Sequence, residues 1–189
     1  MYKILLILFV IVVAGLAWLL TRPAAPKPFA EAYQRALQMH PGENTAIEAG
    51  LKEFAAVYGN LTHPEIGKRV ERLYADPMYF NDSLKTFQSR QHLVDYMKAT
   101  ADMLEDSSVD IQQVLRDGSD VFVRWNMKFR SSAMGKEISS ESIGMTHLRF
   151  DAEGRIVLHQ DFWDSAAGLY RNLPVVGYAL KQVDKRMTD

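Results

Sequence analysis

The stretch from Val121 to Arg130 reads VFVRWNMKFR, and it decides the fold class. Every second residue from the start is apolar: Val121, Val123, Trp125, Met127 and Phe129. Because successive side chains of a β-strand point to opposite faces, this alternation predicts a strand with one apolar face. Two arrangements fit it. Either the apolar face lies in the core and the polar face in water, or the polar face lines a cavity and the apolar face forms a dimer interface.

The sequence on both sides extends this strand into an antiparallel meander. Residues 109–115 lead through a turn at Asp117–Asp120 into the central strand. Residues 137–150 form a long strand after it, and the Gly-containing loop Asp151–Gly154 leads to a last strand over 155–163. Short turns between alternating stretches are typical of antiparallel hairpins.

The first half of the chain is mainly helical. Apolar residues at spacings of three and four predict helices over 30–39, 44–58, 65–74 and 89–104, with short strands near 78–81 and 84–87. Helices and strands that are segregated along the chain favour an α+β fold. We expect a curved antiparallel sheet, covered by helices that shape it into a cone around a pocket.

The N-terminus carries an uncharged, apolar run, Ile4 to Leu20, which reads ILLILFVIVVAGLAWLL. Such a run, with its flanks, is long enough for a single transmembrane helix, so we expect a single-pass N-terminal anchor over residues 1–21 and a location at the membrane. A secretory signal peptide is the alternative. The charges of Lys3 and Arg22 leave the side of the membrane undecided. Residues 22–43 are expected to form a Pro-containing linker and a short helix.

The C-terminal tail, residues 165–189, follows Asp164, which is in position to cap a helix. Apolar residues recur at helical spacing through the tail, although Pro174 and Gly177 should break or kink it. The tail either packs on the domain or on a partner subunit, or lies on the membrane as an amphipathic helix.

The composition excludes several classes of function. Lys and Arg number 22 and Asp and Glu number 23, so the net charge is −1, and no nucleic-acid partner is expected. The chain has no cysteine, which excludes disulfides, thiol nucleophiles and thiolate zinc sites. The spacing of His, Asp and Glu does not match a metal site, so we expect neither a metal nor another cofactor.

Residues 44–164 resemble the nuclear transport factor 2-like superfamily, in particular its SnoaL-like members. The similarity lies in a long first helix, the segment Ala75–Asp82 (ADPMYFND), the hairpin Asp151–Ile156 (DAEGRI) and the terminal segment His159–Asp164 (HQDFWD). The resemblance implies the cone fold. It implies little about function, because this fold carries many activities.

Among enzymes of that superfamily, the local similarity is to limonene-epoxide hydrolase-like proteins. This resemblance implies Asp161 as a general base that holds a water together with Tyr79 and Asn81, while Arg124 orients the carboxylates. The family's acid is replaced by Asn126, which cannot donate a proton as an acid. Asn126, His159 and Trp163 are expected to contact a ligand.

Three functions are compatible with these features. The first is a membrane-tethered module that binds a small apolar or amphipathic molecule. The second is a hydrolase or isomerase with Asp161 as general base. The third is a non-catalytic partner in a membrane-associated complex. A homodimer through the outer sheet face is a possible assembly for each.

Overall fold

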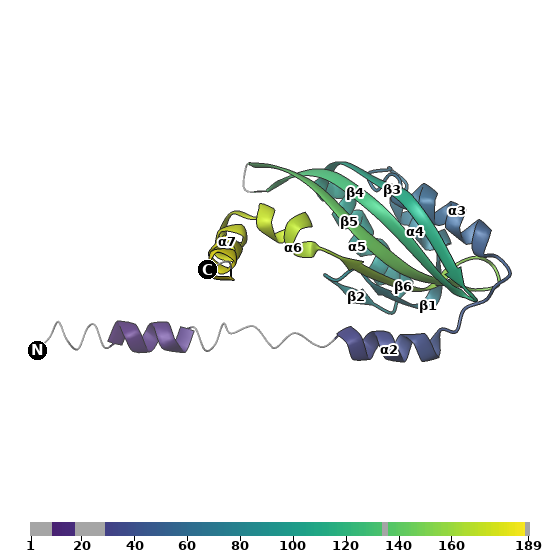
Figure 1. The fold of residues 1–189 in the computed structure, drawn as a ribbon, viewed down its shortest axis with the longest axis horizontal. Helices are drawn as coiled ribbons and strands as arrows, with labels where there is room; N and C mark the ends of the chain where they lie inside the picture. The colour runs from purple at the N-terminus through teal and green to yellow at the C-terminus, as the bar shows by residue number, and fades with distance from the viewer. Residues whose placement is uncertain (1–8, 18–28, 134–135, 188–189) are drawn as a thin grey trace, which may run out of the picture. The chain divides into compact units, whose positions relative to one another are not determined.

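The computed structural model describes residues 9–17, 29–133 and 136–187. The chain divides into two compact units, Met1–Ala32 and Tyr33–Asp189, and each is described by itself. The second unit contains the sheet and the helices that cover it (Figure 1).

The expected transmembrane anchor is not supported. In the described part of the N-terminal segment, the helix covers residues 9–17, and at about 1.5 Å per residue it is much shorter than a hydrocarbon core of about 30 Å. Among the residues that the structure describes, no helix is both long and apolar enough to cross a membrane. The rest of the expected anchor, residues 1–8 and 18–21, lies outside the described residues. The structure therefore corrects both the anchor and the membrane location inferred from it.

The second unit is built on a six-stranded sheet with the order β2-β1-β6-β5-β4-β3. The strands are β1 (Tyr74–Asn81), β2 (Thr86–Phe87), β3 (Leu104–Asp117), β4 (Asp120–Ala133), β5 (Lys136–Phe150) and β6 (Ile156–Trp163). The helices before and between them are α2 (Phe29–Met39), α3 (Ile47–Tyr58), α4 (Ile66–Leu73) and α5 (Arg90–Met103). The α+β class and the meander of the last four strands agree with the sequence analysis.

The sheet is not antiparallel throughout, because β1 pairs with β6 in parallel. The other pairs are antiparallel. Hairpin signals in a sequence report only on neighbouring strands, whereas β1 and β6 are joined through residues 82–155. A parallel pair needs such a long connection, so local patterns do not reveal it.

Strand β3 begins at Leu104, earlier than the residue 109 that alternation predicted. The four residues after Leu104 are polar, but this first part of β3 pairs with the end of β4, from Leu104 opposite Ser131 to Ser108 opposite Lys128. Pairing with a long neighbouring strand therefore extends β3 through residues that have no strand pattern of their own.

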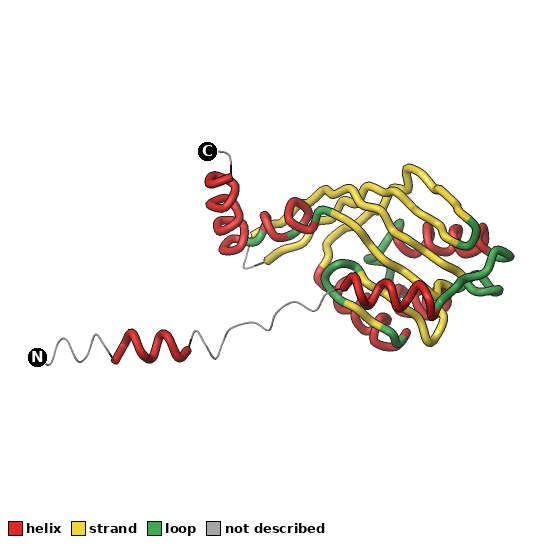
Figure 2. The backbone as a smooth tube through the Cα atoms, turned by 60° about the horizontal axis from the view of Figure 1, so that its bottom comes forward, coloured by secondary structure: helices red, strands yellow, loops and turns green. Residues whose placement is uncertain are grey.

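The core lies between the inner face of the sheet and helices α3, α4 and α5. Phe54, Val70 and Leu93 from the helices pack with Val123 and the other apolar side chains of the sheet. The part of helix α2 that belongs to this unit, from Tyr33 onward, lies against the opposite, outer face, where Tyr33 contacts β5 through His147 (Figure 2). The apolar face of β4 is thus in the core, and its polar face is on the outside of the sheet.

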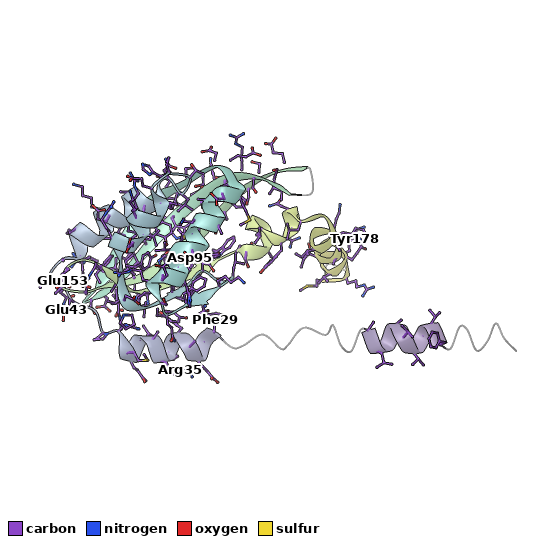
Figure 3. The ribbon with its side chains drawn as sticks, turned by 180° about the vertical axis from the view of Figure 1, so that it is seen from behind. Phe29, Arg35, Glu43, Asp95, Glu153 and Tyr178 are labelled. Atoms are coloured by element: carbon purple, nitrogen blue, oxygen red, sulfur yellow. The ribbon has the colours of Figure 1, made fainter. Side chains whose placement is uncertain are left out.

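The chain ends in three short helical elements: α6 (Ser165–Gly168), η1 (Tyr170–Asn172) and α7 (Pro174–Met187). The Asp164 side chain accepts a hydrogen bond from the backbone N–H of Ala167, which confirms it as the N-cap of α6. The expected break falls where α7 begins, at Pro174. Tyr178 in the first half of α7 is 67% exposed, and Figure 3 labels it on that helix.

Candidate functional site

The candidate site is built on the inner face of β6. His159 pairs with Leu148 of β5, and Asp161 pairs with Thr146, so these side chains share one face with Val123 and Trp125. His159 Nε2 lies 3.0 Å from Asp161 Oδ1. Because a carboxylate can only accept, the imidazole donates this hydrogen bond. The i, i+2 spacing on a strand places the two groups in contact.

Two buried tyrosines continue the network behind His159. Tyr74 Oη lies 2.7 Å from His159 Nδ1, and Tyr58 Oη lies 2.6 Å from Tyr74 Oη. Burial raises the pKa of both phenols well above the usual value, and the negative charge of Asp161 raises them further. Both therefore stay protonated. With a neutral imidazole, Tyr58 donates to Tyr74 and Tyr74 donates to Nδ1.

A second set of donors reaches Asp161 from the other side. Thr146 Oγ1 donates to Asp161 Oδ1 over 2.5 Å, and Trp125 Nε1 donates to Thr146 Oγ1 over 2.8 Å. The Trp125 indole can reach Thr146 because the residue opposite Trp125 on β5 is Gly144. A Cβ on Gly144 would come within 2.3 Å of the indole, so a side chain at this position would displace it.

The two oxygens of Asp161 have different roles in this network. Oδ1 accepts from both His159 and Thr146, whereas Oδ2 has no hydrogen-bond partner among the described residues. The Asp161 side chain is 13% exposed and His159 is 1% exposed. Oδ2 is therefore the oxygen that can accept a proton or a hydrogen bond from another molecule.

Aromatic rings surround the imidazole of His159. The ring centroids of Phe54, Tyr58, Tyr74 and Phe80 lie 4.7 to 6.1 Å from its own. They come from α3 and β1, which pack on β6 from two sides. The carboxylate of Asp161 thus stands at the edge of an aromatic, water-poor region, where charge–dipole interactions are strong.

Tyr79 and Asn81, which the resemblance links to Asp161, lie on the opposite face of the sheet. They pair with Leu158 and Gln160 of β6, which alternate with His159 and Asp161. Tyr79 Oη donates to Gln160 Oε1 over 2.9 Å, and Gln160 Nε2 donates to Asn81 Oδ1 over 3.3 Å. Burial raises the pKa of Tyr79 to about 12.

Arg124 and Asn126 also lie on the outer face. Arg124 donates to Gln112 and Gln113 on β3, and Asn126 donates to Glu141 on β5 over 2.8 Å. The structure therefore brings Asp161 and His159 together on the inner face. Four other predicted site residues lie on the outer face: Tyr79, Asn81, Arg124 and Asn126. The arrangement implied by limonene-epoxide hydrolase-like proteins is not assembled around Asp161.

Trp163 is the third predicted residue on the inner face. Its Nε1 donates to the backbone oxygen of Asp82 over 2.8 Å, and its ring packs on the core. Asp82 in turn accepts a hydrogen bond from Tyr96 Oη over 2.5 Å. The end of β1 and helix α5 thus enclose the region next to Asp161.

A family model for the SnoaL-like domain matches residues 54–159, which is more than half of the chain. The chain belongs to the SnoaL-like domain family. This confirms the resemblance seen in the sequence. No curated protein matches the chain.

Several solved structures share the fold of this SnoaL-like domain. A putative SnoaL-like polyketide cyclase from Shewanella putrefaciens aligns with a TM-score of 0.55 and 17% identity over 63% of this chain and 92% of its own. An epoxide hydrolase of M. tuberculosis, similar to limonene-epoxide hydrolase, aligns with a TM-score of 0.53 and 14% identity over 65% of this chain and 85% of its own. A hypothetical protein with a ketosteroid isomerase-like fold from Catenulispora acidiphila, in complex with trimethylamine, aligns with a TM-score of 0.52 and 20% identity. The alignment covers 65% of this chain and 91% of its own. At these identities the similarity shows the fold alone.

Four members of the Asp161 network were not predicted from the sequence: Tyr58, Tyr74, Thr146 and Trp125. Trp125 was placed on the apolar face of its strand without a polar role, and Tyr58 is the last residue of the helix predicted over 44–58. The available signal is chemical, since a tyrosine or tryptophan on a buried stripe needs a partner for its hydroxyl or N–H group. Tyr74 and Thr146 had no such pattern, because their positions depend on long-range strand pairing.

The SnoaL-like domain has a cavity of about 360 Å³ away from Asp161. It lies between β3, β4 and β5 and is lined by Asp106, Lys128, Phe129, Arg130, Ser139, Ser140 and Glu141. These residues share no member with the Asp161 network. Among the described residues, no group of three or more His, Asp or Glu side chains could hold a metal ion.

Proposed function

We propose that the SnoaL-like domain binds a small, largely apolar molecule against Asp161 and exchanges a proton with it. One observation supports this above the others. Asp161 Oδ1 is fixed by Thr146 and His159, while Oδ2 has no partner in the described part of the chain. A carboxylate that is oriented by one oxygen and open at the other is suited to general-base catalysis.

Proton transfer next to a carbonyl fits this site better than epoxide hydrolysis. Oδ2 would take a proton from a carbon beside the carbonyl and return it to a second carbon, so that the substrate is isomerised without net loss of atoms. This chemistry requires one base at the substrate carbon and a hydrogen-bond donor for the enolate oxygen that forms, but no held water. Epoxide hydrolysis also requires a held water and an acid, and the polar residues implied for those tasks, Tyr79, Asn81 and Asn126, lie on the outer face.

Ligand binding without turnover is the second candidate. It is favoured by the hydrogen bonds that His159 and Thr146 already make, because both donors are occupied and no further acid touches Asp161 among the described residues. In that case Oδ2 would accept a hydrogen bond from a hydroxyl or N–H group of the ligand, and the surrounding aromatic rings would supply apolar contact.

The test compares the wild type with Asp161→Asn and with Asp110→Asn, a matched change on exposed β3. The probe is a β,γ-unsaturated cyclic ketone, whose isomerisation to the conjugated ketone is followed by ultraviolet absorbance. Binding of the conjugated product is followed by the fluorescence of Trp125 and Trp163. We expect Asp161→Asn to lower turnover by about 10²- to 10⁴-fold, as for loss of a general base, with little change in binding. Asp110→Asn should behave as the wild type.

Three other outcomes would decide between the two candidates or exclude both. Equal turnover by the wild type and Asp161→Asn would exclude Asp161 as the base. Binding without turnover, weakened by Asp161→Asn, would support the non-catalytic candidate. If no apolar ketone, alcohol or amine in a small panel binds the wild type, both candidates fail. Far-ultraviolet circular dichroism of each variant confirms that it is folded.

A further inference from the structure

A second polar cluster lies on the outer face of the sheet, and it holds α2 in place. Arg149 of β5 is at its centre. Its Nη1 donates to the backbone oxygens of Leu37 and His40 at the end of α2, over 2.7 and 2.8 Å, and its Nε donates to Asp120 Oδ1 over 2.5 Å. The guanidinium thus caps the C-terminal carbonyls of α2, which a cation stabilises.

His147 connects the same cluster to the middle of α2. Its Nε2 lies 2.6 Å from Asp120 Oδ1, and its Nδ1 lies 2.6 Å from Tyr33 Oη. Since the carboxylate only accepts, Nε2 carries the proton, and Nδ1 of the neutral ring accepts from the Tyr33 hydroxyl. The Phe122 ring stacks on the imidazole at 4.5 Å, so His147 is enclosed and its side chain is 3% exposed.

Apolar contact adds little to this attachment. Ala36 is the one buried side chain among the described residues of α2. The Tyr33 ring meets Phe162 edge-on at 5.8 Å. Figure 3 shows Arg35 on the side of α2 that points away from the sheet. Hydrogen bonds among Tyr33, His147, Asp120 and Arg149, and from Arg149 to the backbone, attach residues 33–40 to the sheet.

The cluster is balanced for neutral histidines. Arg149 contributes one positive charge and Asp120 one negative charge, with Tyr33 and His147 uncharged. His147 is contacted by Tyr33 from α2 and Asp120 from β4, and it lies near Arg149 of β5, while β6 contributes the uncharged Gln160 opposite it. His40 lies next to Arg149, which binds its backbone oxygen. A proton on His147 Nδ1 removes the acceptor of the Tyr33 hydroxyl and adds a second cation beside Arg149, with a single carboxylate to offset both.

The pKa shifts of these side chains favour neutral histidines and a charged Asp120. Burial lowers the pKa of His147, and Arg149 lowers it further, against the opposing effect of Asp120. Burial and Arg149 also lower the pKa of His40. Burial alone would raise the pKa of Asp120, but hydrogen bonds from Arg149 and His147 outweigh it, so the carboxylate stays charged. Burial raises the pKa of Tyr33, which stays protonated.

Acid should weaken the attachment of α2 to the sheet. With α2 in place, both histidines bind a proton more weakly than they would in water, where the reference pKa is 6.5. The stability that α2 gains from neutral histidines is fully present above that value. It is lost as the pH falls below 6.5 toward the lowered pKa of each ring.

We propose that residues 33–40 form an acid-released cover on the outer face of the sheet. Release uncovers the buried ring of His147 and the part of the Phe162 ring that meets Tyr33. The inner face with Asp161 is on the other side of the sheet, so this device is separate from the proposed proton-transfer site.

The test uses the absence of native cysteine in the full chain. Gln38 on α2 and Glu53 on α3 are both exposed, and each is replaced by cysteine and spin-labelled. Electron double resonance then gives the label-to-label distance distribution between pH 8 and pH 5. We expect one narrow distribution at pH 8 and a broad, longer one at pH 5, with the midpoint below 6.5.

The matched variants are His147→Gln, which cannot be protonated, and His92→Gln, which changes an exposed histidine on α5. His147→Gln should shift the opening to lower pH. The double variant His147→Gln with His40→Gln should not open above pH 5, and His92→Gln should open as the wild type does.

If His147→Gln does not fold at pH 8, His40→Gln alone must still shift the midpoint. A wild type that stays closed at pH 5, or opening that is unchanged in the His147 and His40 variants, contradicts the proposal. Opening that coincides with a loss of near-ultraviolet circular dichroism also contradicts it, because the whole unit then unfolds.

Discussion

At the scale of single residues, the candidate site depends on a residue without a side chain. Gly144 lies between Trp125 and Trp163 on adjacent strands, and the Trp125 indole occupies the space that a Cβ would fill. The indole then donates to Thr146, which donates to Asp161. The orientation of the carboxylate therefore depends on a position two residues away from Thr146 on the same strand.

Gly144→Ala should destabilise the domain. The added Cβ would lie 2.3 and 2.4 Å from two indole atoms, so Trp125 must move. Overpacking of this kind costs about 1–3 kcal/mol, and the Trp125–Thr146 hydrogen bond would also be lost. Urea unfolding followed by circular dichroism measures the free energy. Ser139→Ala, at an exposed position of the same strand, should change it by less than about 0.5 kcal/mol. Unchanged stability of Gly144→Ala would show that the indole does not occupy this space.

Part of the site could be predicted from the residues. The i, i+2 rule for strands places His159 beside Asp161, and both lie on the inner face as this rule requires. The same rule cannot decide which face of β1 or β4 joins them, because that depends on register. Tyr79, Asn81, Arg124 and Asn126 follow their own alternation correctly, yet pairing with β6 and β5 places them on the outer face.

At the scale of elements, α5 shows how a helix with a narrow buried stripe is held. Leu93 and Met97, four residues apart, are its buried residues, and they pack on the core from one side of the helix. Its N-cap residue, Ser89, makes no side-chain capping hydrogen bond. Its stability therefore comes from packing more than from its own ends.

Leu93→Ala should destabilise the protein strongly. The side chain is 0% exposed, so its loss leaves a cavity, at a cost of about 2–5 kcal/mol. Met103→Ala on the same helix is the matched control, because Met103 is 64% exposed and should change stability by less than about 0.5 kcal/mol. Thermal and urea unfolding of both variants test this. Similar losses for the two variants would mean that α5 does not pack as described.

Elements with a strong period were predictable, whereas elements defined by their neighbours were not. The helices over α3, α4 and α5 follow from apolar spacing. The start of β3 at Leu104 does not, because its polar residues are extended only by pairing with β4. The described part of the N-terminal apolar run is a helix over residues 9–17, and the rest of that run lies outside the described residues.

At the scale of the whole molecule, the unit Tyr33–Asp189 contains the complete sheet, its covering helices and the Asp161 network. The α+β class was predictable from the order of helices and strands. The parallel β1–β6 pair was not, because no local turn specifies it. The homodimer through the outer face remains a prediction. Exposed Ile143, Met145 and Phe162 lie on that face and are compatible with it.

A chain of residues 33–189 should fold without residues 1–32. The contacts that define the core lie within the unit Tyr33–Asp189. We expect its free energy of unfolding to agree with that of the full chain within about 0.5 kcal/mol, the range of changes away from packed residues. Urea unfolding of both proteins in one buffer measures this. A loss of several kcal/mol, or loss of cooperativity, would show that the first 32 residues complete the core.

The parallel pairing of β1 with β6 also has a consequence for the order in which the protein is made and folds. A ribosome delivers Tyr58 and Tyr74 early, but β6, which carries His159 and Asp161, is the last of the described strands to emerge. The hairpins of β3 to β6 are local and can form quickly, whereas joining β1 to β6 closes a long loop and is expected to be slow. Nascent chains that stop before Ile156 therefore carry the apolar stripes of α3 to α5 without β6, one of the strands that cover them. Such fragments lack His159 and Asp161, and we expect them to be substrates for chaperones and proteases.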